Sequence, residues 1–290
     1  MPSRRTAAKL HPAERFLAPG AIERGAPLKE LIGPSLVSLL AESFAAAVPG
    51  FEAQRFQQRA LEGLADLELS PRAAHVADSL AAQLPADFRR AGPLVIAALG
   101  PELAKTKANG LATFFYLPHS HLIAARGPSQ FAAGMQANYE LTKRFTAEFS
   151  LRPFLVQHQD RALRLLAKWV QDPNPHVRRL VSEGTRPRLP WAMRLRAFQE
   201  DPGYTLPLLE RLKDDSEPYV QRSVANHLGD LLKDHPDAVF ALCEAWVEQA
   251  RKLPAAQAKA RLWIVRHAVR LPAKQGERRA LELRARAALK

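Results

Sequence analysis

The stretch of sequence that decides the fold is a segment that occurs twice, as WVQDPNPHVRRLV at residues 169–181 and as LKDDSEPYVQRSV at residues 212–224. Each position of the first copy lies 43 residues before its counterpart in the second. The residues before each copy match as well, with apolar side chains at three- and four-residue steps, which is the spacing of a helix. The spacing therefore predicts a tandem repeat of helix pairs.

The repeated residues have physical roles that fit this interpretation. In the first copy, Asp172 is expected to cap the incoming helix, Pro175 to begin it and Val177 to pack inward. Prolines between apolar runs mark helix starts elsewhere in the chain too. A two-helix unit of about 40–47 residues is the period of HEAT and armadillo repeats. We therefore expect an all-α fold, a HEAT-like helical repeat solenoid.

Basic residues recur in the same register. Arg179 and Arg222 occupy equivalent positions, and Arg266 follows 44 residues after Arg222 in a looser third copy. The whole chain of 290 residues has 42 Lys and Arg against 29 Asp and Glu, a net charge of +13. Such an excess favours an anionic partner, either nucleic acid or a membrane surface, over the alternative of a generally basic proteome. The prediction is a basic concave face.

The sequence favours one repeat domain over residues 26–290, after a basic and partly disordered lead-in over residues 1–25. Three or four helices are expected over residues 26–110, and another over residues 139–154, ended by Arg152-Pro153. No apolar run approaches the roughly 18 residues of a membrane span, and no signal peptide is apparent. We expect a cytoplasmic monomer.

The single cysteine and a pair of closely spaced histidines are not candidates for catalysis or metal binding. Cys243 is the single cysteine and lies in an apolar helical stretch, so it is interpreted as a core residue in a reducing compartment. His119 and His121 have no Cys or carboxylate at ligand spacing, so no metal site is predicted. No phosphate-binding glycine loop is present.

The repeat is interrupted by the segment VRRLVSEGTRPRLPW at residues 177–191. Gly184 and Pro187 are expected to end the helix early, and the loop that follows carries Arg186 and Arg188 and closes on Trp191. Charged and aromatic residues on an irregular loop suit a functional site better than packing.

Several segments together resemble the AlkC family of bacterial DNA glycosylases. The matching segments are LTKRFTAEFSLRPF (141–154), HVRRL (176–180), SEGTRPRLPW (182–191), SVANHLGD (223–230) and WIVRHA (263–268). The string EGTRPRLPW is long enough to be specific. Some members of this family carry a C-terminal immunoglobulin-like domain, and this chain resembles the shorter form without it.

The resemblance implies excision of cationic alkylated bases, notably 3-methylcytosine and 3-methyladenine, from double-stranded DNA in base excision repair. It implies hydrolysis of the N-glycosidic bond without a metal or cofactor. Carried over to this chain, Glu148 and Asp230 are the carboxylates that stabilise an oxocarbenium-like sugar and deliver water. Glu183 is a third carboxylate that supports Arg179 or the lesion. The alternatives are a surface ion pair of Glu148 with Arg152, four residues on, and a helix-terminal role for Asp230.

The remaining candidates concern DNA contact. Trp191 is expected to stack on the cationic lesion, or alternatively to anchor its loop in apolar packing. A row of phosphate contacts is predicted for Arg179 and Arg222. For Arg179 and Arg222, solvated surface charge is the alternative. Further phosphate contacts are predicted for Arg152, Lys143, Arg186 and Arg188.

Two functions of different class remain open from the sequence. One is the DNA glycosylase, active in the bacterial cytoplasm and associated with the nucleoid through DNA. The other is a non-catalytic HEAT-like module that binds unusual DNA structures or a protein partner. The presence of both Glu148 and Asp230 favours the enzyme.

Overall fold

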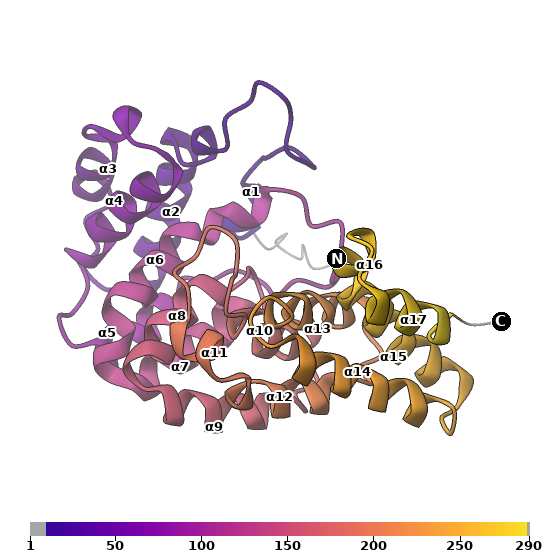
Figure 1. Cartoon of the computed structure of the whole chain (residues 1–290). Coiled ribbons are helices and arrows are strands. Elements are labelled where there is room, and N and C mark those ends of the chain that lie inside the picture. Colours follow the sequence, from indigo (N-terminus) through magenta and orange to yellow (C-terminus); the bar gives the residue numbers. More distant parts are fainter. Residues whose placement is uncertain (1–9, 289–290) are drawn as a thin grey trace, which may run out of the picture. The chain divides into compact units, whose positions relative to one another are not determined.

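The computed structural model describes residues 10–288, and every regular element within that range is a helix (Figure 1). The predicted all-α fold is therefore confirmed. Backbone contacts group the chain into two compact units, residues 1–145 and residues 146–290.

The first unit contains four main helices over residues 26–110, where the sequence predicts three or four, and two more after them. Part of the expected lead-in is ordered as α1, while residues 1–9 lie outside the described residues. The helices of this unit are α1 (Pro12–Arg15), η1 (Leu28–Leu31), α2 (Pro34–Ala47), α3 (Ala53–Leu61), η2 (Leu64–Asp66), α4 (Leu69–Ala81), α5 (Phe88–Ala97), η3 (Ala112–Tyr116), α6 (Leu117–Arg126), η4 (Gly127–Gln130) and α7 (Phe131–Thr142).

One segment of the first unit corrects the expectation about apolar runs. The helical stretch Leu28–Ala47 has 20 residues and a mean hydropathy of 1.2, so by length and composition it is apolar enough to cross a membrane. Leu36, Leu40 and Phe44 of this stretch are completely buried in the unit. Such burial is typical of the core helix of a folded unit.

The second unit stacks helix pairs in the predicted register. Its helices are α8 (Glu148–Gln157), α9 (Gln159–Trp169), α10 (Pro175–Gly184), α11 (Arg196–Glu200), η5 (Pro202–Tyr204), α12 (Leu206–Leu212), α13 (Pro218–Leu231), α14 (Pro236–Ala250), α15 (Ala255–Ala268), α16 (Arg270–Lys274) and α17 (Arg278–Arg286). The pairs α9–α10 and α12–α13 are the two copies of the repeat. Helices α8, α10, α13 and α15 pack against one another in that order, as one layer of the stack (Figure 1).

The cap of the repeated helix lies two residues later than predicted. The side chain of Asn174, not of Asp172, accepts from the His176 amide at 2.9 Å and caps α10. Asp172 instead accepts from the amide of Asn174 at 2.8 Å. Asp215 does the same to Glu217 at 2.9 Å in the second copy. Each aspartate thus fixes the turn between helices, as Asx side chains commonly do.

The helix predicted over residues 139–154 is also wrong. Helix α7 ends at Thr142, and α8 begins at Glu148 with Pro153 in its interior. The chain turns after Leu141, whose carbonyl accepts from the amides of both Arg144 and Phe145 at 2.9 Å.

Candidate active site

Three helices of the layer formed by α8, α10, α13 and α15 bring three carboxylates together in the second unit. Glu148 begins α8, Glu183 is the penultimate residue of α10 and Asp230 that of α13. Their side chains are nearly buried, with residue exposures of 7%, 6% and 6%. Gly184, which ends α10, permits this approach because a Cβ there would meet Leu151 Cδ2 of α8 at 2.5 Å.

Arg179 lies between two of these carboxylates. Its Nη1 forms an ion pair with Glu148 Oε2 and donates to Thr146 Oγ1 at 2.7 Å. Its Nη2 lies 3.5 Å from Glu183 Oε1. The guanidinium carbon is 5.0 Å from the centroid of the Tyr219 ring, within cation–π range. The side chain is therefore fixed between groups of α8, α10 and α13.

Arg186 continues this arrangement to the third carboxylate. Its Nη1 donates to Glu183 Oε1 at 2.7 Å, and its Nε donates to Asp230 Oδ2 at 2.8 Å. Ser223 Oγ donates to Glu183 Oε2 at 2.7 Å, so both oxygens of Glu183 are used. The result is a charged row, Glu148–Arg179–Glu183–Arg186–Asp230, in which three carboxylates alternate with two guanidiniums.

The pKa shifts of the two end carboxylates of the charged row are opposite to that of the middle carboxylate. Burial raises the pKa of Glu148 above its ordinary value although Arg179 opposes the shift. Burial likewise raises the pKa of Asp230, against the opposing effect of Arg186. Burial acts in the same direction on Glu183, but Arg179 and Arg186 outweigh it and lower its pKa. The arginines thus more than offset the effect of burial on the pKa of the middle carboxylate, Glu183. They only partly offset it for the two end carboxylates, which are therefore under-compensated.

Each end also has an oxygen without a protein partner. Within residues 10–288, Glu148 and Asp230 accept hydrogen bonds through one oxygen only, Oε2 and Oδ2 respectively. Their other oxygens, Oε1 and Oδ1, remain for water or for a cationic group. This combination of burial, raised pKa and unused acceptors is the chemistry of a site for a positive charge.

The structure corrects the prediction for Arg152. Its side chain is completely buried and donates to three backbone carbonyls, Gly184 at 3.1 Å, Arg186 at 2.9 Å and Met193 at 2.6 Å. Burial, together with neighbouring Arg186, lowers its pKa to about 10. Arg152 therefore anchors the loop after α10 and has no exposed guanidinium for phosphate. It is not the partner of Glu148 either, since that role belongs to Arg179.

The loop after α10 presents Trp191 to solvent. Trp191 is 84% exposed and has a φ of +62°, an uncommon conformation for a residue with a side chain. The alternative of an apolar anchor is therefore wrong. Arg188, on the same loop, forms a two-pronged pair with Asp234, with Nη2–Oδ1 at 2.6 Å and Nε–Oδ2 at 3.0 Å.

The other basic residues predicted to contact DNA differ in whether carboxylates pair with them. Arg222 is exposed on α13 and has no ion pair among the described residues. Arg179 and Arg186 belong to the charged row, so the predicted phosphate row of Arg179 and Arg222 is split. Lys143 lies in the first unit, where Glu102 and Glu140 pair with it at 2.9 and 3.0 Å.

Sequence reasoning missed three residues of the site, namely Thr146, Tyr219 and Ser223. For Ser223 a signal existed. It stands 43 residues after Leu180, so a hydroxyl occupies a position that is apolar in the first copy, and both side chains are buried. A polar residue at a core position of a repeat indicates a buried hydrogen-bonding partner.

Metal ligands are not grouped in the part of the chain that the structure covers. Among residues 10–288, no three His, Cys, Asp or Glu side chains lie close enough together to hold a metal ion. His119 is completely buried in aromatic surroundings, and burial lowers its pKa to about 3. Its neighbours Phe44, Phe115 and Tyr116 lie within 6.0 Å between ring centroids.

Comparison with known proteins gives two informative likenesses. No model of a known protein family matches the chain. It is 32% identical over 259 residues to the uncharacterized protein YhaZ of Bacillus subtilis strain 168, covering 89% of this chain and 68% of that protein. It also resembles the structure of Pseudomonas fluorescens alkylpurine DNA glycosylase AlkC bound to DNA containing an abasic site analog. There the identity is 39% and the TM-score 0.77, over 89% of this chain and 68% of that one.

Proposed function

Since this chain belongs to the AlkC family of DNA glycosylases, we propose that it releases cationic N-alkylated bases from double-stranded DNA. The substrates we infer are 3-methylcytosine and 3-methyladenine, and the reaction is hydrolysis of the N-glycosidic bond. The observation that carries the proposal is the charged row, whose two ends are nearly buried carboxylates with raised pKa and one unused oxygen each.

The proposed reaction uses the charge that the substrate already has. When the bond from C1′ to the base nitrogen breaks, its electron pair goes to the base, so a cationic base leaves neutral. The positive charge moves to the sugar, which becomes oxocarbenium-like. A carboxylate beside the sugar stabilises that charge most where water is excluded. Glu148 and Asp230 are placed in such surroundings, at exposures of 7% and 6%.

Water completes the reaction. Its oxygen adds to C1′, and its proton passes to a carboxylate and then to solvent, so atoms and charge balance. A raised pKa makes a carboxylate a better proton acceptor, which suits Glu148 and Asp230 to this step. We assign both residues as catalytic carboxylates.

Glu183 receives a different role in this proposal. Its two oxygens already accept from Arg186 and Ser223 at 2.7 Å each. It is a positioning residue that holds Arg179 and Arg186, which in turn orient the two catalytic carboxylates. Of the two roles expected from the sequence, support of the arginines is the one we propose.

Trp191 is our candidate for contact with the lesion nucleotide. Its indole is 84% exposed on a loop tied to the site through Arg152. A cationic base over an indole gains about 0.5–2 kcal/mol that a neutral base would not. Stacking of this kind selects by charge, which matches the class of substrate.

The alternative function, a non-catalytic module that binds DNA structures, fits the charged row less well. Under-compensated carboxylates repel phosphate, so they weaken a surface whose purpose is to hold a DNA backbone. Two ionised carboxylates at nearly buried positions are instead what a developing positive charge requires.

The experiment that tests the proposal measures base release under single-turnover conditions from a duplex with one 3-methylcytosine or 3-methyladenine. Glu148→Gln and Asp230→Asn each remove a charge and keep the shape. We expect each to slow release by about 100-fold or more, the usual loss for one electrostatic group at a transition state. Asp234→Asn, which changes a carboxylate paired with Arg188 at 2.6 Å outside the charged row, is the matched control and should stay within a few-fold of wild type.

Two outcomes would overturn the proposal. One is a wild-type protein that binds the duplex and releases no base. The other is release by both Glu148→Gln and Asp230→Asn at the wild-type rate.

A further inference from the structure

Four arginines at the C-terminal end of the second unit form no ion pair with a carboxylate of residues 10–288, although the charge of Asp230 acts on one of them, Arg270. They are Arg222 on α13, Arg266 on α15, Arg270 on α16 and Arg284 on α17. Among the described residues, none of the four forms an ion pair. Most other arginines between α10 and α17 are paired, the exceptions among the described residues being Arg194, Arg196 and Arg211. The paired ones are Arg178, Arg179, Arg186, Arg188, Arg251, Arg261, Arg278, Arg279 and Arg286.

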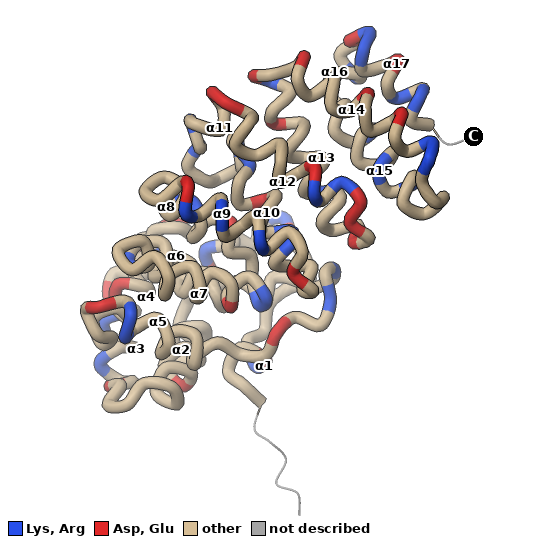
Figure 2. Tube along the Cα trace, turned by 90° about the horizontal axis from the view of Figure 1, so that it is seen from below, with Lys and Arg blue, Asp and Glu red and all other residues tan. Residues whose placement is uncertain are grey.

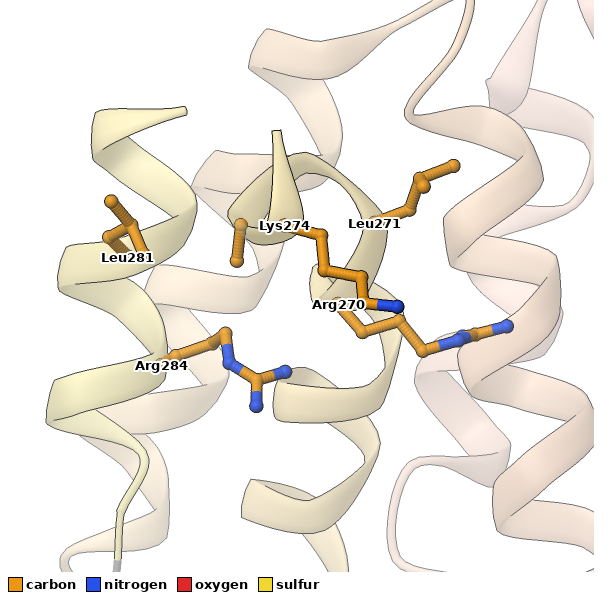
Figure 3. A pocket seen from close by; sticks show the side chains of 6 residues that line it. Arg270, Leu271, Lys274, Leu281 and Arg284 are labelled. Carbon is orange, nitrogen blue, oxygen red and sulfur yellow. The ribbon is translucent and has the colours of Figure 1, made fainter. Parts of the chain in front are cut away.

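Two adjoining hollows lie at this end of the unit, and Arg270 and Arg284 line both. One, of about 520 Å³, lies between α16 and α17 and is also lined by Leu271, Lys274 and Leu281 (Figure 3). The other, of about 310 Å³, is completed by Trp263, Arg266 and His267. We call the two hollows together the arginine groove.

The guanidiniums of the arginine groove are held in place by neutral acceptors. Arg270 donates to the His267 carbonyl at 2.7 Å and to Asn226 Oδ1 at 3.0 Å. Arg284 donates to the Arg266 carbonyl at 2.8 Å, and Arg266 to the Ala287 carbonyl at 3.0 Å. A guanidinium has five N–H donors, so each keeps donors for an anion while its position is fixed.

The positive charges act on a common neighbour. His267 stacks on Trp263, with ring centroids 4.7 Å apart and an interplanar angle of 13°. Burial, and then the charges of Arg270, Arg222 and Arg284, lower the pKa of His267 to about 4. The ring is thus neutral at pH 7, and three arginines lie close enough to it to repel a fourth positive charge.

The arginine groove is connected to the candidate active site through α13. Arg222, Asn226 and Asp230 follow one another at four-residue steps and therefore share one face of that helix. Arg270 bonds to Asn226 at 3.0 Å. At about 1.5 Å per residue, Asn226, the residue that Arg270 contacts, lies roughly 6 Å from Asp230 along the helix, and Arg222 lies roughly 12 Å from it. Successive nucleotides of one strand rise about 3.4 Å, so these spans equal about two to four base pairs.

We propose that the arginine groove binds phosphodiesters of the DNA backbone a few nucleotides from the lesion. The unpaired charges, the pre-positioned donors and the position along α13 support this assignment. Basic residues also occur along α15 and α17 (Figure 2). The exposed leucines beside the arginines, Leu271 at 51% and Leu281 at 50%, suit the apolar edge of deoxyribose. The inference rests on the proposed function only in taking DNA as the partner.

The test is the salt dependence of binding to undamaged duplex DNA. For Arg270→Ala/Arg284→Ala, we expect the slope of log K against log salt concentration to fall by about 2, close to one unit for each phosphate that the variant no longer neutralises. Arg270→Lys/Arg284→Lys keeps both charges and should keep most of the slope. The matched control is Arg251→Ala/Arg278→Ala, which makes the same change in net charge at arginines paired with Glu248 and Glu282.

A wild-type slope for the alanine double variant, or an equal fall for the control, would overturn the inference. Because the DNA is undamaged, the result is independent of catalysis. If wild type releases no base but the slopes differ as expected, the proposed function fails and the arginine groove stands.

A second arm separates backbone phosphate from a free phosphate ion. Titration with inorganic phosphate is followed by tryptophan fluorescence, with Trp263→Phe identifying the signal from the groove. We expect no saturable change at millimolar phosphate. A saturable change that disappears in Arg270→Ala/Arg284→Ala, with unaltered DNA slopes, would assign the groove to a small anion and contradict the proposal.

Discussion

Individual carboxylates of the charged row change the stability of the fold in opposite directions as pH changes. A folded-state pKa above the ordinary value means that the folded protein binds more protons than the unfolded chain between the two values. For Glu148, whose pKa burial raises, stability therefore falls as pH rises through that window. For Glu183, whose pKa the two arginines lower against burial, stability is present above the unfolded pKa and is lost as pH falls through the folded one.

This difference predicts the effect of two matched substitutions on unfolding at pH 7. Glu148→Gln removes a carboxylate whose ionisation destabilises the fold, so its unfolding free energy should equal or exceed that of wild type. Glu183→Gln removes one whose ionisation stabilises the fold, so it should unfold more easily. Denaturant titration measures both. A Glu148→Gln protein less stable than Glu183→Gln would contradict this account of the row.

The pH dependence of base release also depends on a single residue, Asp230. Burial raises the pKa of Asp230 above its ordinary value of 3.8. The ionised form is the active one, so the single-turnover rate should fall on acidification with a midpoint above that value. Spontaneous base loss from the same DNA is the control at each pH. A rate that stays constant down to the ordinary pKa would argue against an essential carboxylate in these surroundings.

At the scale of structural elements, the loop after α10 depends on Arg152. Arg152→Met would leave the carbonyls of Gly184, Arg186 and Met193 without their donor. The bonds to Gly184 and Arg186 are buried, and each unsatisfied buried carbonyl costs about 1–3 kcal/mol, so we expect a loss of about 2 kcal/mol or more. Arg188→Met, which breaks the partly exposed pair with Asp234, should cost about 1 kcal/mol or less. Equal losses in thermal unfolding would contradict the anchoring role.

Periodicity predicted the paired helices but not their ends. The 43-residue register identified α9–α10 and α12–α13 because apolar spacing and prolines repeat there. The break between α7 and α8 was missed, since an apolar stripe continues across residues 141–149 whether or not the chain turns. Local pattern also suggested Arg152 as the partner of Glu148. The actual partner, Arg179, is 31 residues away and is brought there by the packing of α8 on α10.

At the scale of the whole molecule, the basic residues behind the net charge of +13 have different roles. The sequence predicted a basic face from composition and repeat register, and the resemblance named the catalytic candidates. The sequence did not distinguish arginines that are paired with carboxylates from arginines without such partners. That distinction depends on contacts between residues far apart in the sequence, such as Arg186 with Asp230 and Arg188 with Asp234, which are separated by 44 and 46 positions.

This distinction predicts different effects for two arginines at equivalent repeat positions. Arg222→Ala removes an exposed charge without an ion pair, so the salt slope of duplex binding should fall by about 1. Arg179→Ala removes a charge held between Glu148 and Glu183, so base release should slow while the slope changes little. The two measurements are binding against salt concentration and single-turnover release. An equal fall in slope for both variants would restore the simple row of phosphate contacts.

The most direct test of the central claim is the identity of the product. Methylated duplex DNA is incubated with the wild-type protein and with Asp230→Asn in EDTA, and free bases and abasic sites are quantified together. The account predicts free 3-methyladenine and 3-methylcytosine from wild type, in amounts equal to the new abasic sites, and about 100-fold slower release from Asp230→Asn. Wild-type protein that yields no more free base or abasic sites than Asp230→Asn would contradict it.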